Sequence, residues 1–338
     1  MKAVVLVGGQ GTRLRPLTET VKKELLPLVD RPILDHTLDR LVRHGVHEVV
    51  LSSSYLEETF RAFIESRHGE PRITWISETE PLDTGGAIVN ALPALDTDGP
   101  FLALNGDILT DLDLTRMLAL HRDREATATI ALAHVEDARP FGLVPLDGDG
   151  RVREFREKPV DLVPGDINAG TYVLEPSALE AWRPGVRVSI ERTVFPSLID
   201  DGRALFGFVS GAYWRDLGTP QAYLQAHFDL LDGKVQGEPP FDAPFVADEA
   251  RIDDGAEVNR HVVLGPGASI GGDAIVTDSV LHGRTRVGDG ARVSGSIVGR
   301  GSQIRGGRVV GSVLGERVTV LPGAEVVDER VSPGTTLP

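Results

Sequence analysis

The first candidate for chemistry is a glycine-rich loop that follows the first apolar run of the sequence. The stretch "VVLVGGQGTRLRPLT" (4–18) places five residues suited to anion binding close together: Gly8, Gly9, Gly11, Thr12 and Arg13. Glycines leave backbone N–H groups free to point at phosphate oxygens, and a guanidinium offers a rigid fork of donors that fits phosphate. We interpret the stretch as an anion-binding loop, and the alternative is a simple tight turn.

This loop differs from two better-known phosphate-binding motifs. A Walker A loop needs G-x-x-x-x-G-K-[ST], which is absent, and the dinucleotide fingerprint needs a glycine where Leu14 stands. Lys22 and Lys23 follow at the end of the same loop and add positive charge. The residues alone indicate an anionic ligand without identifying it.

The elements that must position this loop alternate between strand and helix. Apolar runs predict strands at four places: 3–7, 47–53, 73–77 and 101–107. Helical spacing predicts helices between them: 32–45, 55–69 and 86–95. This alternation predicts an α/β fold with a Rossmann-like, mostly parallel mixed sheet and helices on both faces. Ligands of such sheets lie beyond the carboxyl ends of the strands, where we expect the 8–13 loop and residues 105–107.

The chain changes character after about residue 235. A Gly/Pro-rich connector (232–243) precedes aliphatic residues that mostly recur six apart: Ile252, Val258, Leu264, Ile270, Val276, Val287, Val293, Ile304 and Val310. Small residues stand two places before many of them: Ala256, Ala268, Ala274, Thr285, Ala291 and Ser302. One inward aliphatic and one small corner residue per six suit stacked coils, and the pattern resembles the left-handed parallel β-helix of hexapeptide-repeat proteins. We therefore predict two domains, 1–235 and 244–338.

Composition narrows the classes of protein. A net charge of −15 over 338 residues argues against general binding to nucleic acid or to anionic membranes, because both need basic surface. The absence of cysteine excludes disulfides and Cys-ligated zinc and fits a reducing compartment. No run approaches the roughly 18 apolar residues of a membrane span, and the first residues do not follow the pattern of a signal peptide. We expect a soluble, cytoplasmic protein.

Longer motifs give the chain a family resemblance. "GGQGTRLRPLT" (8–18) and "KKELLPLVDRPIL" (22–34) resemble the signature of the sugar-1-phosphate nucleotidylyltransferases, and six further stretches follow in family order: "EPLDTGGAI" (80–88), "LNGDIL" (104–109), "FGLV" (141–144), "FREKP" (155–159), "NAGTYVLEP" (168–176) and "WRDLGTPQAYLQA" (214–226). The resemblance covers about residues 1–230. The repeat region is similar to the long branch of this family, which includes mannose-1-phosphate guanylyltransferases. The resemblance implies the reaction NTP + sugar 1-phosphate → NDP-sugar + pyrophosphate, with Mg²⁺ as cofactor.

The resemblance also assigns roles to matching positions. Arg13 and Lys23 match the catalytic residues that steady the leaving pyrophosphate and neutralise charge on the transferring phosphoryl group. Asp107 and Asp216 match the two metal-binding aspartates. The positions that match nucleotide contacts are Gly8, Gly9, Gly11, Thr12, Glu80, Thr84, Gly85, Gly86, Asn105 and Gly106. The positions that match sugar-phosphate contacts are Gly142, Glu157, Lys158, Asn168 and Gly170.

The chain departs from the family pattern at three positions. Lys22 stands where proline or serine is frequent, so a shift of register would exchange the roles of Lys22 and Lys23. Glu24 stands where proline is common and leaves the catalytic lysine in place. Asp83 replaces a common glycine, and it either caps the following helix or contacts the base or ribose.

The roles of two histidines and the identity of the substrates remain open. We interpret His261 and His282 of the repeat region as solvated loop histidines rather than as bases for acyl transfer. The first hypothesis for the substrates is GTP with mannose 1-phosphate. The alternatives are glucose 1-phosphate with dTTP, UTP or ATP, a cyclitol or heptose phosphate, and a non-catalytic regulatory relative. We expect a homo-oligomer, assembled through the repeat region.

Overall fold

The computed structural model describes residues 1–53, 58–157 and 163–338. The chain forms two compact units, of which the first is made of 1–9 and 37–214 and the second of 10–36 and 215–338. The glycine-rich loop therefore leaves the first unit after Gly9, and its remaining residues belong to the same unit as the repeat region. The predicted division between residues 235 and 244 stays a prediction.

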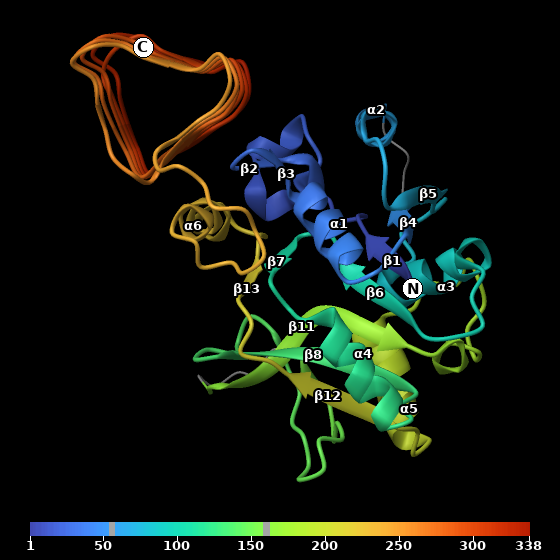
Figure 1. Cartoon of the computed structure of the whole chain (residues 1–338). Helices are drawn as coiled ribbons and strands as arrows, with labels where there is room; N and C mark the ends of the chain where they lie inside the picture. Colours follow the sequence, from blue (N-terminus) through green and yellow to red (C-terminus); the bar gives the residue numbers. More distant parts are fainter. Residues whose placement is uncertain (54–57, 158–162) are drawn as a thin grey trace. The chain divides into compact units, whose positions relative to one another are not determined.

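A nine-stranded mixed sheet forms the centre of the first unit (Figure 1). Its strands are β1 (Lys2–Leu6), β4 (Glu48–Ser53), β5 (Arg72–Ser77), β6 (Phe101–Asn105), β8 (Ala128–Val135), β9 (Gly142–Leu143), β10 (Arg156–Glu157), β11 (Gly165–Leu174) and β12 (Leu205–Val209). Strands β6, β1, β4 and β5 are parallel neighbours in that order. Strand β11 runs antiparallel to β6 and β8, and β12 is parallel to β8. The predicted mixed α/β sheet is confirmed.

Helices and shorter elements surround the strands. The helices are α1 (Ile33–Arg43), α2 (Glu58–Ser66), α3 (Asp83–Leu95), α4 (Leu114–Asp123), α5 (Phe195–Asp200) and α6 (Pro220–Leu231). Four short strands complete the chain up to residue 244: β2 (Pro27–Leu28), β3 (Arg31–Pro32), β7 (Ile108–Thr110) and β13 (Trp214–Asp216). Among the residues that the structure describes, no helix combines the length and the apolar character needed to cross a membrane.

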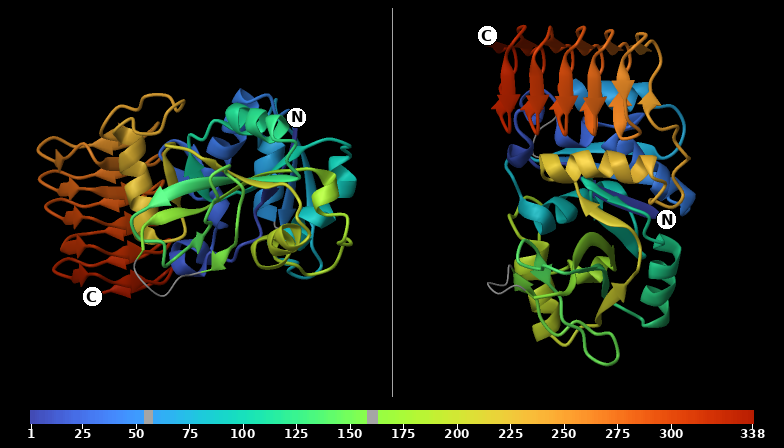
Figure 2. Two further views of the ribbon diagram at one scale, coloured as in Figure 1. Left: turned by 90° about the horizontal axis from the view of Figure 1, so that it is seen from below. Right: turned by 90° about the vertical axis from the view of Figure 1, so that its left-hand side faces the viewer.

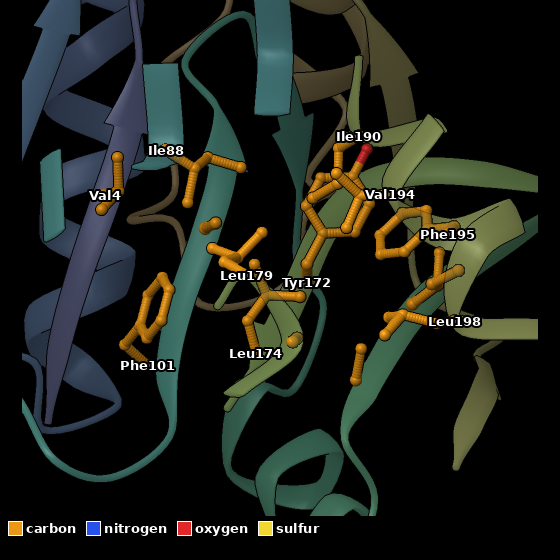
Figure 3. Packing of buried hydrophobic residues seen from close by; sticks show 14 of the residues in the cluster. Val4, Ile88, Phe101, Tyr172, Leu174, Leu179, Ile190, Val194, Phe195 and Leu198 are labelled. Carbon is orange, nitrogen blue, oxygen red and sulfur yellow. The ribbon is translucent and has the colours of Figure 1, made fainter. Parts of the chain in front are cut away.

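The sheet of the first unit is buried on both faces. Val4 of β1, Ile88 of α3 and Phe195 of α5 belong to one hydrophobic cluster on one face (Figure 3). Ala3 and Val5 point to the opposite face, because side chains alternate along a strand, and both are fully buried. Burial on both faces explains why β1 reads as a continuous apolar run.

Helix α3 begins earlier than its apolar spacing predicts. The expected helix starts at residue 86, whereas the observed helix starts at Asp83 and includes residues 83–85 in its first turn. Asp83 has a positive φ of 62° and its Oδ1 accepts a hydrogen bond of 2.9 Å from the N–H of Thr84. The predicted start was wrong because glycines, which usually break a helix, are here required by close packing, as shown below.

The repeat region forms a parallel β-helix in the second unit. Each coil contributes to three parallel sheets and encloses a triangular cross-section, and the coils stack in a regular column (Figures 1 and 2). The first sheet contains β14 (Phe245–Val246), β17 (Val262–Leu264), β20 (Ser279–Leu281), β23 (Ile297–Val298), β26 (Val313–Leu314) and β29 (Arg330–Val331). The second contains β15 (Arg251–Ile252), β18 (Ser269–Ile270), β21 (Arg286–Val287), β24 (Gln303–Ile304), β27 (Thr319–Val320) and β30 (Thr336–Leu337). The third contains β16 (Glu257–Val258), β19 (Ile275–Thr277), β22 (Arg292–Ser294), β25 (Arg308–Val310) and β28 (Glu325–Val327).

One of the predicted inward positions was wrong, and a second keeps its register but is exposed. Val293 pairs with Val309, and Val309 is fully buried, whereas Val310 is only half-buried. The shift follows Gly306–Gly307, where the coil is one residue shorter than the six-residue spacing assumes. Ile252 is 38% exposed because it lies on the first rung of its sheet, where only one side is covered by a further coil.

The corrected register predicts a large loss of stability for one of two neighbouring substitutions and a small change for the other. Val309→Ala removes two buried methyl groups and should lower the free energy of unfolding by about 2 kcal/mol, since each buried methyl or methylene contributes about 0.8 kcal/mol and a cavity adds to the loss. Val310→Ala, the matched control, should change it by less than about 0.5 kcal/mol. Chemical unfolding followed by circular dichroism measures both, and a larger loss in Val310→Ala would contradict the observed register.

Candidate active site

The carboxyl ends of β1 and β6 lie side by side in the first unit. Leu6 pairs with Asn105, and the N–H of Gly106 donates a hydrogen bond of 2.9 Å to the carbonyl of Leu6. A Cβ atom at Gly106 would lie 2.9 Å from Val7 Cγ1 and 3.1 Å from the Leu6 carbonyl oxygen. Only glycine therefore allows this close approach. The predicted positions Gly8 and Gly9, which follow β1, and Asp107, which follows β6, leave the sheet at one edge.

Two predicted sugar-phosphate residues reach the same edge from β11. Gly170 has a φ of 68°, and a Cβ there would lie 2.6 Å from Asn105 Nδ2. Its N–H donates to Asn168 Oδ1 at 2.9 Å, and Asn168 Nδ2 donates to the Tyr172 hydroxyl at 2.9 Å. Asn105, Asn168 and Gly170 are therefore brought together, as their predicted roles require.

A cavity of about 370 Å³ opens beside these residues in the first unit. It is lined by Asp83, Phe141, Gly142, Asn168, Ser189, Glu191 and Arg192. Gly142 and Asn168 are predicted site residues, and Asp83 is one of the three positions at which the chain departs from the family pattern. Asp83 is the first residue of α3, and its Oδ2 pairs with Arg192 Nη2 at 2.8 Å in the lining of the cavity.

Glu191 is the residue of this cavity that sequence reasoning missed. Its carboxylate accepts hydrogen bonds from Thr84 Oγ1 at 2.7 Å, from Ser189 Oγ at 2.9 Å and from the Tyr172 hydroxyl at 3.3 Å. Thr84 in turn accepts a bond of 3.0 Å from the N–H of Ile190. The one available signal is a charged pair inside the apolar stretch "VSIERTVF" (188–195).

Thr84, Gly85 and Gly86 have a structural reason for their identity. Gly85 and Gly86 are buried, and a Cβ at Gly85 would lie 3.0 Å from the Ile190 nitrogen. A Cβ at Gly86 would collide with the carbonyl of Val186. The N–H of Gly86 donates a hydrogen bond of 2.8 Å to the Val188 carbonyl. The glycines therefore let α3 approach this strip of backbone, and their contact with a nucleotide stays a prediction.

The remaining predicted residues of the first unit are Glu80, Glu157 and Lys158. Glu80 is exposed and lines a second cavity of about 350 Å³ together with Arg187. Glu157 pairs through its backbone with Gly142 in the ladder of β10 and β9. Lys158 lies outside the described residues. The roles of these residues stay predictions.

The second unit holds the predicted catalytic arginine. Arg13 and Thr12 lie in a short 3₁₀ turn, Thr12–Leu14, and both are exposed. Arg13 Nη2 lies 3.5 Å from Asp216 Oδ2. A Cβ at Gly218 would collide with the Arg13 guanidinium. The motif "RDLG" therefore packs against the arginine that the phosphate-binding prediction names.

The lysine pair lies at the other end of the same loop. Gly11 has a φ of 61°, its carbonyl accepts from Thr18 Oγ1 at 2.7 Å, and a Cβ there would lie 3.4 Å from Lys23 Cβ. Lys22 and Lys23 are both buried, with side chains and backbone together only 7% and 8% exposed. Burial does not separate the two lysines, so the choice of Lys23 stays a prediction.

The β-helix contacts the backbone of this loop. Arg330 Nη1 donates to the Arg13 carbonyl at 3.0 Å and lies 3.5 Å from the Arg15 carbonyl. Nothing in the repeat pattern singles out this arginine, because it occupies an ordinary outward position of β29. The contact fixes the carbonyl side of the turn that carries the Arg13 guanidinium.

The interpretation of His282 as a solvated residue was wrong. His282 is 7% exposed, and its Nε2 lies 3.1 Å from the hydroxyl of Tyr223, which itself donates to the Pro27 carbonyl. Burial lowers the pKa of His282 to about 4. His261, by contrast, is half-buried, stacks on Phe228 with ring centroids 4.8 Å apart and lies 3.1 Å from Asp232 Oδ1.

The predicted metal site is divided between the units. Asp107 follows β6 in the first unit, and Asp216 ends β13 in the second. Within the described ranges, no cluster of three or more His, Cys, Asp or Glu side chains is placed to hold a metal ion. A shared Mg²⁺ at Asp107 and Asp216 stays a prediction.

Comparisons with known proteins show the family of the chain. A family model described as "Nucleotidyl transferase" matches residues 2–233, and one described as "GMPPB C-terminal domain" matches residues 242–337. The "Mannose-1-phosphate guanylyltransferase" of Mycobacterium tuberculosis is 38% identical and covers 91% of this chain and 82% of its own. "Mannose-1-phosphate guanylyltransferase 1" of Arabidopsis thaliana is 35% identical and covers 95% and 92%. The crystal structure of HddC from Yersinia pseudotuberculosis complexed with GMP-PN is 29% identical, with a TM-score of 0.59, and covers 68% of this chain and 98% of that one.

Acid should destabilise the second unit through His282. Its pKa of about 4 in the fold lies below the ordinary 6.5, so the unfolded chain binds more protons between these values and stability is lost as the pH falls through that window. The expected loss from this residue is about 2 kcal/mol at about pH 5 relative to pH 7. Chemical unfolding at both pH values, followed by circular dichroism, measures it.

Two glutamine variants isolate this effect. His282→Gln should show a smaller acid loss than the unsubstituted protein, with part of the loss retained because burial also lowers the pKa of His227. His68→Gln, at an exposed position, should keep the full loss. Equal acid losses in both variants would contradict the role of His282.

Proposed function

The chain belongs to the nucleotidyl transferase family, and we propose that it converts GTP and mannose 1-phosphate to GDP-mannose and pyrophosphate. The structural observation that carries the proposal is the edge of the first unit's sheet at which β1 ends beside Asn105 and Gly170 packs against Asn105. The choice of substrates is supported by the names of the relatives from Mycobacterium tuberculosis and Arabidopsis thaliana, and by the guanine nucleotide analogue in the HddC crystal structure.

The reaction needs no nucleophile from the protein. An oxygen of the sugar phosphate attacks the α-phosphorus of GTP and forms the new O–P bond. The bond from the α-phosphorus to the bridging oxygen breaks, and that oxygen leaves with pyrophosphate. Both reactants are anions, so the protein must hold them in line and neutralise their charge.

Two cationic side chains supply charge in this proposal. Arg13 is 64% exposed at its side chain, and its ion pair to Asp216 is long at 3.5 Å, so N–H donors of the guanidinium remain available for pyrophosphate. Lys23 lies in the turn Lys23–Leu25, whose approach to Gly11 keeps the two ends of the loop together. Lys23 would neutralise charge on the transferring phosphoryl group.

A divalent metal ion is general in this family, and we propose Mg²⁺. Asp107 and Asp216 fit it in chemical type, because carboxylate and phosphate oxygens are the ligands that Mg²⁺ prefers. When bound, the ion would neutralise phosphate charge. Asp107 is half-buried at a strand end, and Asp216 is held beside Arg13, so both carboxylates have fixed positions within their own units.

The cavity beside Asn168 is the proposed site of the sugar. Its polar lining offers an amide, the Ser189 hydroxyl and the Glu191 carboxylate, which suit sugar hydroxyl groups. Glu191 is held by three side-chain donors, so its oxygens have fixed directions. Recognition of a particular epimer needs such fixed partners, because a missing hydrogen bond to a buried group is costly.

A matrix of nucleotides and sugar phosphates tests the substrates. GTP with mannose 1-phosphate should release pyrophosphate fastest when Mg²⁺ is present, and EDTA should abolish the release. The matched alternatives are dTTP, UTP and ATP with glucose 1-phosphate, and GTP with a heptose phosphate. Faster turnover of any alternative would replace the proposed substrates, and binding of GDP-mannose without any turnover would indicate a regulatory relative.

A pair of lysine variants tests the assigned catalytic residue. Lys23→Ala should lower kcat by about 10²–10³-fold, the typical effect of removing one preorganised charge. Lys22→Ala is the matched control, because the two lysines are adjacent and equally buried, and it should lower kcat by less than about 10-fold. Melting temperatures of both variants report on folding. The reverse order of the two effects would assign the role to Lys22.

The predicted homo-oligomer and the role of the β-helix in assembly remain part of the proposal. Light scattering of the full chain gives the number of subunits. The contact of Arg330 with Arg13 also supports a role of the β-helix in holding the loop, in addition to any role in assembly.

A further inference from the structure

A cavity of about 440 Å³ lies within the second unit, at one corner of the β-helix. We call it the corner pocket. One wall is the loop that carries the lysine pair, represented by Leu17, Val21 and Leu25, and the other wall consists of successive corners of the β-helix, including Arg284 and Arg300. A volume between about 300 and 1,000 Å³ is typical of sites for small molecules. No role described above uses this pocket.

Two arginines stand in the middle of the corner pocket. Arg284 and Arg300 are exposed and lie on consecutive coils. In the part of the chain that the structure describes, neither guanidinium has an ion pair or a hydrogen bond. Glu249 and Glu316 line the pocket on coils to either side of the arginines. Positive charge in the centre and carboxylates at the ends define what an occupant must carry.

Arg284 adopts a backbone conformation that favours glycine. The register of the first sheet places it at the same corner as Gly267 and Gly301 of the adjacent coils, which have φ values of 67° and 71°. Arg284 adopts a φ of 61°. This left-handed region suits glycine, and it disfavours a residue that carries a Cβ atom by about 1 kcal/mol or more. An arginine at this corner therefore costs stability that glycine would not.

We propose that the corner pocket binds a small phosphate ester. The guanidinium groups of Arg284 and Arg300 would hold the dianionic phosphate, since each offers a planar fork of donors that matches phosphate oxygens. Hydroxyl or amino groups of the ester reach the carboxylates of Glu249 and Glu316. The apolar side chains of Leu17, Val21 and Leu25 cover the carbon skeleton.

Occupancy of the corner pocket acts on the catalytic loop. Val21 and Leu25 flank the lysine pair in the chain and form the wall of the pocket. On the opposite wall, His282 contacts the Tyr223 hydroxyl, which holds the Pro27 carbonyl at the end of the same loop. A ligand between these walls sets the position of Lys23, so binding there couples to turnover.

Calorimetric titration of the full chain tests the binding site. The probes are inorganic phosphate, glucose 6-phosphate and AMP, which separate the phosphate itself from sugar and nucleoside esters, and succinate serves as a carboxylate of similar charge. One saturable site per chain is expected for at least one ester, tighter than for phosphate and at least 10-fold tighter than for succinate. No saturable site, or equal affinity for succinate, would overturn the proposal.

Substitutions locate the site on the corner pocket. Arg284→Gly with Arg300→Ala should weaken ester binding at least 10-fold, and glycine at 284 keeps the observed φ. Arg286→Ala with Arg292→Ala removes the same charge from exposed positions outside the pocket, on two strands that belong to different sheets, and it should leave the affinity unchanged. Equal loss in both double variants would reduce the effect to general charge and overturn the assignment.

Two further measurements separate this site from the proposed reaction. Arg13→Ala should keep the ester site, because Arg13 does not line the pocket, and loss of the site in this variant would place the ester at the catalytic loop instead. Saturation with the ester should change the rate of pyrophosphate release at least 2-fold in the unsubstituted protein but not in Arg284→Gly/Arg300→Ala. The binding measurement stands even if GTP and mannose 1-phosphate are not the substrates.

Discussion

The parallel pairing of β1 with β6 decides where the chemistry of the first unit lies. Parallel neighbours end at the same edge, and the hydrogen bond from Gly106 to Leu6 continues the pairing to the last residue of both strands. The glycine turn after β1 and the aspartate after β6 therefore emerge together. Gly170 then packs against Asn105 from β11, which brings the neighbouring cavity and its carboxylate, Glu191, to this edge. Loss of that pairing would separate every one of these groups.

The second unit contains both the loop that carries the proposed catalytic residues and the β-helix. Residues 10–36 form one compact unit with the β-helix, and two independent contacts connect them, the Arg330 bond to the Arg13 carbonyl and the Tyr223 bonds to Pro27 and His282. The β-helix thus takes part in shaping the loop. This arrangement connects the stack of coils directly to the loop that carries Arg13 and Lys23, the two residues proposed to bind phosphate.

Periodic and locally encoded features can be predicted well from the sequence. The remaining features depend on how distant parts of the chain pack. Strand and helix alternation and the six-residue repeat follow from hydrophobic spacing, which local residues determine. The register failed at Val310, because a coil shortened at two glycines cannot be recognised by counting in sixes. The start of α3 was missed because Gly85 and Gly86 serve a contact with residues far along the chain. Burial of His282 and the partners of Glu191 depend on such distant contacts too.

Arg330 limits how the length of the β-helix can vary. It lies on the last rung of a six-stranded sheet, and neighbouring rungs of a sheet are spaced by about 4.8 Å. Inserting or deleting a single coil before it would move the guanidinium by one such step, which exceeds the reach of its 3.0 Å bond to the Arg13 carbonyl. A relative that preserves this bond is therefore expected to have the same number of coils before the arginine.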